Sequence, residues 1–206
     1  MKTDSSSIFS KRLLALTALV LLLAELALIL LSWILSATGM EGVRSLLSSE
    51  GIRWFVGGFN DMVSSSLLVW LVILLMAFGA FQRSGLPLLA DATYQMTYRE
   101  KTALRVALAF LIAYIAVILM LTVIPHAILL SATGSLFPSP FSRSIVPLTA
   151  FGITLMSVTF GVMSGRLRGL ADILDALSSG ISKGAPLFVL YILLIQLVRS
   201  VWFVFT

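Results

Sequence analysis

Long runs of apolar residues alternate with short polar segments along the chain. Five of these runs are about the length of a membrane-spanning helix, because a helix rises about 1.5 Å per residue and the hydrocarbon layer is about 30 Å thick. They comprise residues 13–37, 62–81, 107–124, 145–163 and 185–205. Only the first, with Glu25, and the last, with Arg199, contain a charged side chain. The pattern predicts an all-α polytopic membrane bundle of about five transmembrane helices, forming a single membrane domain over residues 1–206.

Two further segments have the mixed pattern of helices that lie along a membrane surface. Residues 40–58 and 166–182 place apolar residues at helical spacing opposite charged ones, so we expect amphipathic interfacial helices there. Glycines interrupt the first segment, which favours two short pieces. Residues 131–144 contain Pro138 and Pro140, which block helix and predict an irregular connection.

Composition and charge agree with a membrane location. Hydrophobic residues make up 59% of the chain and charged residues 11%, against about a quarter charged in a soluble domain. The net charge of +5 is explained by basic residues at cytoplasmic helix ends rather than by nucleic acid. Ten Lys and Arg side chains fall on one side of the five-span arrangement and four on the other, which predicts a cytoplasmic N-terminus and an outer C-terminus. The first apolar run exceeds the ~7–15 residues of a signal peptide, so we expect an uncleaved span.

A small polar site is predicted inside the membrane. Glu25 lies in mid-span, where a charge is costly and often functional, and Gln196 falls at a similar depth, one turn from Arg199. A Glu25–Gln196 hydrogen bond and a Glu25–Arg199 ion pair are both compatible with this spacing. The site is either a proton-titrating group of a coupled transporter or a polar clamp between two helices with Glu25 protonated.

Other patterns are less specific. Gly161, Gly165 and Gly169 repeat at a small-xxx-small spacing, which predicts helix packing, within the bundle or against a second copy or partner subunit. His126 is the sole histidine and there is no cysteine, so we expect no metal site, no cofactor and no disulfide. The absence of any nucleophile or metal motif disfavours an intramembrane enzyme.

Two blocks of sequence resemble the AbgT family of p-aminobenzoyl-glutamate transporters. In the first block, an S-L-L-S-x-E-G-[LI]-R-W stretch is followed by a span that ends in S-G-L. In the second, S-P-F-x-x-x-[IV]-V-P leads into a span and a basic, Asp-containing loop, and Gln196 falls where the family's final span has an A-A-Q-F segment. The matching residues are Glu50, Gly51, Arg53, Trp54, Ser84, Gly85, Pro140, Phe141 and Pro147.

This resemblance implies a transporter of p-aminobenzoyl-glutamate or a similar amphipathic anion in a bacterial cytoplasmic membrane. The chain looks like the head and tail of the family without the central region that carries an S-N-T-A-S-D type stretch. Two functions therefore stay open at this point. One is a reduced transporter, with proton coupling at Glu25. The other is a non-transporting membrane scaffold or interaction protein derived from the same family.

Overall fold

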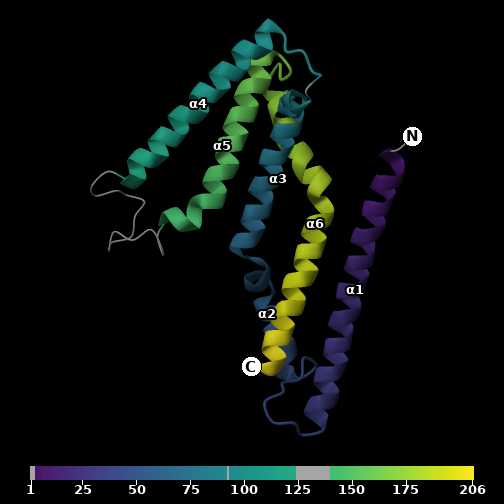
Figure 1. The fold of residues 1–206 in the computed structure, drawn as a ribbon. Coiled ribbons are helices and arrows are strands. Elements are labelled where there is room, and N and C mark those ends of the chain that lie inside the picture. The colour runs from purple at the N-terminus through teal and green to yellow at the C-terminus, as the bar shows by residue number, and fades with distance from the viewer. Residues whose placement is uncertain (1–2, 92, 124–139) are drawn as a thin grey trace. The chain divides into compact units, whose positions relative to one another are not determined.

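The computed structural model describes residues 3–91, 93–123 and 140–206, and these residues form helices joined by short loops (Figure 1). The elements are α1 (Thr3–Ala37), α2 (Ser49–Val63), α3 (Ser66–Ser84), the 3-10 helix η1 (Leu86–Ala90), α4 (Tyr98–Val123), α5 (Pro140–Ser164) and α6 (Leu170–Phe205). Five of them, α1, α3, α4, α5 and α6, are long and apolar enough to cross a membrane. The predicted fold class is confirmed.

The chain divides into two compact units. The first unit comprises residues 1–68 and 185–206, and the second comprises residues 69–184. The first therefore holds α1, α2 and the C-terminal part of α6, while the second holds most of α3 together with α4, α5 and the N-terminal part of α6.

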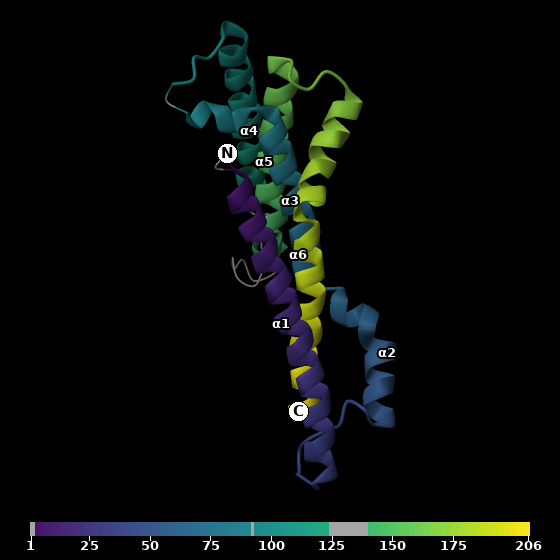
Figure 2. The ribbon, with the colours of Figure 1, turned by 90° about the vertical axis from the view of Figure 1, so that its right-hand side faces the viewer.

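Within the first unit, the C-terminal part of α6 lies between α1 and α2 (Figures 1 and 2). The loop after α1 is tied to both long helices. The backbone N–H of Leu46 donates to Ser32 Oγ at 3.2 Å, and the N–H of Arg44 donates to the carbonyl of Val204 at 2.9 Å. The ring of Trp54 on α2 stacks on that of Phe203 on α6, with centroids 4.4 Å apart.

Within the second unit, glycines bring α3 and α6 into backbone contact. A Cβ added to Gly79 would collide with the backbone of Ala176 and Gly180, and one added to Gly180 would collide with the backbone of Leu75. Small residues permit this approach in lipid, where helix association depends on close packing. A small apolar core beside η1 comprises Leu86, Ala103, Ala107 and Phe160.

Several predicted boundaries differ from the observed ones. The apolar run 62–81 is broken at Ser64–Ser65, and α3 begins only at Ser66. The hydroxyl of Ser65 accepts a hydrogen bond from the N–H of Leu67 at 3.2 Å, an example of serine competing with helical backbone bonds. The first interfacial segment forms turns and then one helix, α2, rather than two short pieces.

The inner surface helix expected over 166–182 and the span expected over 185–205 form one continuous helix, α6 (Figure 1). The side of its first half that carries Ala176 and Gly180 packs on α3, while Leu170 and Leu174 of the predicted apolar face are exposed. Residues 140–144, expected to be irregular, belong to α5, because proline fits the first position of a helix. The rest of that connection and His126 lie outside the described residues.

Candidate functional site

The structure brings two of the predicted site residues together through a third. Ser200 Oγ donates to Glu25 Oε1 at 2.6 Å, and Gln196 Nε2 donates to Ser200 Oγ at 3.2 Å. Gln196 and Ser200 lie one turn apart on α6 and are buried, while Glu25 on α1 is half-buried. Glu25 and Gln196 are thus linked by a serine rather than by a direct hydrogen bond.

Two oxygens of this network have no partner. Glu25 Oε2 and Gln196 Oε1 are both buried and accept no hydrogen bond. A buried acceptor without a donor costs about 1–3 kcal/mol. The cluster therefore has more acceptor oxygens than donors.

A hollow of about 200 Å³ lies next to the Glu25 carboxyl group. Its other lining side chains are all apolar and come from α1, α2 and the loop between them: Ile29, Leu46, Leu47, Ile52 and Phe55. Apolar walls leave the carboxylate few favourable contacts and strengthen electrostatic effects on it.

Arg199 is not part of this network. The ion pairs within the described ranges are Arg44–Glu50 and Arg166–Glu100, so Glu25 and Arg199 form none. Arg199 lines a different hollow, with Arg44 and Trp54 among its neighbours. Ser200 was missed because a serine in an apolar span usually bonds to its own backbone; its i+4 spacing from Gln196 was the available signal.

The first family-like block builds the start of α2. Ser48 Oγ accepts from the N–H of Gly51 at 3.0 Å and caps the helix. Glu50 lies in the first turn of the helix, where its negative charge interacts favourably with the helix dipole. Gly51 is buried, and an added Cβ would lie 2.6 Å from the carbonyl oxygen of Ser45. Arg53 is exposed, and Trp54 packs on Phe203 as described above.

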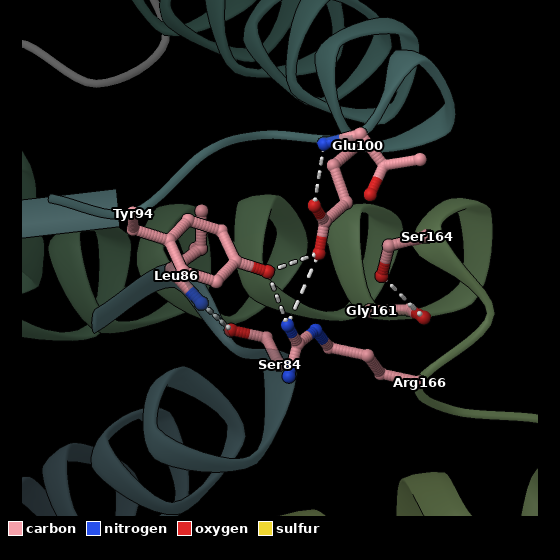
Figure 3. A network of polar contacts seen from close by, with 8 residues as sticks. Ser84, Leu86, Tyr94, Glu100, Gly161, Ser164 and Arg166 are labelled. Atoms are coloured by element: carbon pink, nitrogen blue, oxygen red, sulfur yellow. Dashed lines mark hydrogen bonds and ion pairs between the residues drawn. The ribbon is translucent and has the colours of Figure 1, made fainter. Parts of the chain in front are cut away.

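The S-G-L motif and the basic loop of the second block meet at one polar network (Figure 3). Ser84 Oγ accepts from the N–H of Leu86 at 3.2 Å, and Gly85 has φ +88°. A side chain on Gly85 would collide with the guanidinium group of Arg166. The motif therefore ends α3, and the missing side chain of Gly85 leaves space for Arg166 from the loop after α5.

Arg166 forms an ion pair with the buried carboxylate of Glu100. Its Nη2 donates to Glu100 Oε1 at 3.0 Å and to Tyr94 Oη at 2.9 Å, and Tyr94 Oη donates to the same carboxylate oxygen at 2.7 Å. Glu100 Oε2 accepts from the N–H of Thr97 at 3.0 Å. The hydrogen bond to the Glu100 carboxylate raises the pKa of Tyr94, and the same carboxylate raises the pKa of Arg166.

Sequence reasoning missed this network, although part of it was visible. Thr97 and Glu100 have the S/T-x-x-E spacing of a capping box, in which the glutamate reaches back to the first N–H of the helix. Arg166 is remote in sequence and gives no such signal. The network joins the segment before α4, the first turn of α4 and the loop after α5.

The predicted glycine stripe does not form one helix face. α5 ends at Ser164, Gly165 has φ +82°, and a Cβ added to Gly169 would meet open space. The N–H of Arg166 donates to the Gly161 carbonyl at 2.9 Å and that of Gly165 to the Val162 carbonyl at 3.0 Å, which is a Schellman cap. Gly161 remains a packing position, because an added Cβ would lie 2.8 Å from Leu167 Cγ.

The prolines of the second block shape α5. Pro140 begins the helix and Pro147 lies inside it. The hydroxyl of Tyr114 on α4 donates to the carbonyl of Leu148 at 2.9 Å, next to Pro147. Phe141 and Tyr114 line an apolar hollow of about 350 Å³ between these two helices. In the described part of the chain, no group of three His, Cys, Asp or Glu side chains could hold a metal ion.

Comparison with known proteins identifies the family. The model of the AbgT putative transporter family matches residues 78–203, more than half of the 206-residue chain. This range includes the S-G-L motif, the Arg166 network and Gln196, while Glu25 and the S-L-L-S-x-E-G-[LI]-R-W stretch of the first block lie outside it. No curated protein and no solved structure matches the chain. The resemblance carried by the second block is confirmed: the chain is an integral membrane protein that belongs to the AbgT transporter family.

Proposed function

We propose that the protein transports an amphipathic anion, such as p-aminobenzoyl-glutamate, in exchange for or together with protons that bind at Glu25. The observation that carries the proposal is the buried Glu25 Oε2, which has no hydrogen-bond partner. Membership of a transporter family supports transport as the activity. The charge bias of the loops supports a cytoplasmic N-terminus in a bacterial cytoplasmic membrane, and the proposal includes a homo-oligomer or a partner subunit as the transporting form.

The coupling follows from the donor and acceptor balance of the network. With Glu25 ionised, the cluster combines a charge at membrane depth with two unsatisfied acceptors, and both features are unfavourable. A proton removes the charge and supplies a donor. Two protonation states that differ this much in free energy favour different arrangements of α1 against the C-terminal part of α6, and a ligand that binds one arrangement better becomes coupled to the proton.

Transport assays on purified protein in sealed vesicles test the proposal. Uptake of labelled p-aminobenzoyl-glutamate is measured with and without an imposed pH gradient. We expect the wild type to accumulate substrate when the gradient is present, and Glu25→Gln to lose this dependence. Glu41→Gln is the matched control, because Glu41 is an exposed carboxylate of the same unit and should keep wild-type coupling.

Each outcome separates the alternatives left open by the sequence. Equal gradient dependence in wild type and Glu25→Gln would remove Glu25 from the coupling mechanism. Absence of flux in the wild type, with either direction of the gradient, would favour the non-transporting scaffold.

A further inference from the structure

One side of α4 changes from basic to apolar along the helix. Its exposed residues recur every three or four positions, which places them on one helix face. We call this face the basic–apolar stripe, and it comprises Tyr98, Lys101, Arg105, Leu108, Ile112, Ile115 and Leu119. α4 has 26 residues and is therefore about 39 Å long, longer than the ~30 Å hydrocarbon layer. Its first turns, which carry the basic residues, thus reach the level of the lipid headgroups.

The stripe is separate from the side of α4 that packs inside the second unit. Glu100, Ala103 and Ala107 are buried on that side, and the two alanines belong to the small apolar core beside η1. Within the described residues, the stripe is left exposed along its whole length. It is therefore a surface that the membrane itself can cover.

The basic end of the stripe lacks a protein anion. The ion pairs of the described ranges involve neither Lys101 nor Arg105. The nearby carboxylate of Glu100 is already bonded to Tyr94, Arg166 and the N–H of Thr97. Like charges four residues apart on a helix repel each other. An anion that contacts both side chains would remove this repulsion.

The apolar end of the stripe leads into a hollow. Ile115 and Leu119 line the hollow of about 350 Å³ between α4 and α5. Ten residues separate Arg105 from Ile115, which corresponds to about 15 Å along the helix. Two acyl chains placed end to end make up the ~30 Å hydrocarbon layer, so one chain also covers about 15 Å. The spacing of the basic pair and the hollow therefore matches one lipid molecule.

We propose that the basic–apolar stripe binds one anionic phospholipid. Lys101 and Arg105 hold the phosphate through charge-assisted hydrogen bonds. One acyl chain follows Leu108 and Ile112 and ends in the hollow. Tyr98, which is 84% exposed, adds a hydroxyl donor at the headgroup level. The inference goes beyond the transport proposal and is independent of it, because it concerns equilibrium binding in the second unit, whereas Glu25 belongs to the first.

A free phosphate ion is the competing occupant of the basic end. Such an ion would use Lys101 and Arg105 but would leave the apolar half of the stripe and the hollow unused. A membrane lipid satisfies both halves at once, since its charge and its chains are covalently joined. We therefore assign the stripe to a phospholipid rather than to a soluble anion.

Native mass spectrometry of the full-length protein in detergent micelles tests the headgroup contact. Phosphatidylglycerol and phosphatidylcholine with the same acyl chains are titrated, and each bound lipid is identified by its mass. We expect the wild type to bind phosphatidylglycerol about tenfold more tightly. The double variant Lys101→Gln/Arg105→Gln should lose this preference. The control Arg83→Gln/Arg168→Gln removes two exposed positive charges near the same helix ends and should keep it.

A second pair of variants tests the acyl-chain contact. Ile153 lines the hollow and is 40% exposed, so Ile153→Trp should fill part of the hollow. We expect it to weaken both lipids about threefold while the headgroup preference stays. Val162→Trp changes a similarly exposed residue of α5 outside the hollow and should bind both lipids as the wild type does.

Several outcomes would overturn the proposal. They are equal affinities of the wild type for the two lipids, equal loss of preference in the two double variants, and unchanged binding in Ile153→Trp. A further arm adds excess inorganic phosphate. Phosphatidylglycerol that stays bound supports the phospholipid, whereas its release would show that the basic pair binds a free anion.

Discussion

Each unit of the molecule holds one glutamate in a hydrogen-bonded network, and the two carboxylates differ in the number of hydrogen bonds that they accept. In the second unit, Glu100 receives hydrogen bonds from Tyr94, Arg166 and the N–H of Thr97. In the first unit, Glu25 receives one, from Ser200, and its other oxygen is buried without a partner.

The difference separates a carboxylate with both oxygens hydrogen-bonded from one that keeps a buried oxygen without a donor. The charge of Glu100 is paired with Arg166 and both of its oxygens accept hydrogen bonds, so the carboxylate links the start of α4 to the segment before it and to the loop after α5. Glu25 forms no ion pair among the described residues, and only one of its two oxygens accepts a hydrogen bond. Under the proposed proton coupling, the first unit holds the proton-binding site, and the Glu100 network of the second unit serves stability.

The largest effect should come from the contact between α3 and α6 in the second unit. Gly180→Ala places a Cβ against the backbone of Leu75, and because backbone cannot rotate away, we expect a loss of about 3 kcal/mol in the free energy of unfolding. Denaturant unfolding in micelles, followed by circular dichroism, measures this loss.

Gly57→Ala is the control for Gly180→Ala, because Gly57 is helical and has open space around it. It should change stability by less than about 1 kcal/mol, in the stabilising direction expected for Gly→Ala in a helix. Similar effects at the two glycines would show that the close contact between α3 and α6 does not determine the stability of the second unit.

A smaller loss is expected from Arg166→Gln, which leaves the buried Glu100 carboxylate without its cation. Two donors remain and the Arg166 side chain is 33% exposed, so we expect a loss of about 2 kcal/mol rather than the full cost of an unpaired buried charge. The same unfolding measurement applies. Arg168→Gln removes an exposed positive charge from the same loop and should have almost no effect; if it matches Arg166→Gln, the ion pair is not what stabilises the loop.

The smallest effect on stability is expected at Glu25. Glu25→Gln keeps the shape and the acceptor for Ser200, and its amide adds donors to a cluster that lacks them, so the free energy of unfolding should stay within about 1 kcal/mol of the wild type. The comparison of the two carboxylates predicts this near neutrality together with the loss of proton coupling. A loss as large as that of Arg166→Gln would instead identify Glu25 as a polar clamp and remove the distinction between the units.

The features that were predictable are those written locally in the chain. A span of apolar residues is recognised without knowing its neighbours, so the five membrane helices and their approximate ends followed from hydropathy. Glu25 and Gln196 could be placed at a common depth because depth depends on distance along a helix. The family was recognisable from S-G-L and S-P-F motifs, which the structure explains as a helix end at Ser84 and a helix start at Pro140.

The features that were missed depend on how each helix is rotated about its axis. Ser200 faces Glu25 while Arg199, its neighbour in sequence, lines another hollow. The close helix contact expected at Gly165 occurs instead at Gly180. Arg166 is hydrogen-bonded to Glu100, which lies 66 residues away in the sequence. In lipid, every face of an apolar helix is acceptable to the solvent, so hydrophobicity does not select the facing side.

Thus the sequence determined which segments enter the membrane and to what depth, because transfer into lipid is a property of each segment alone. Only the tertiary structure decided which carboxylate has both oxygens hydrogen-bonded and which keeps a buried oxygen without a donor, because that depends on the donors that packing brings within hydrogen-bonding distance.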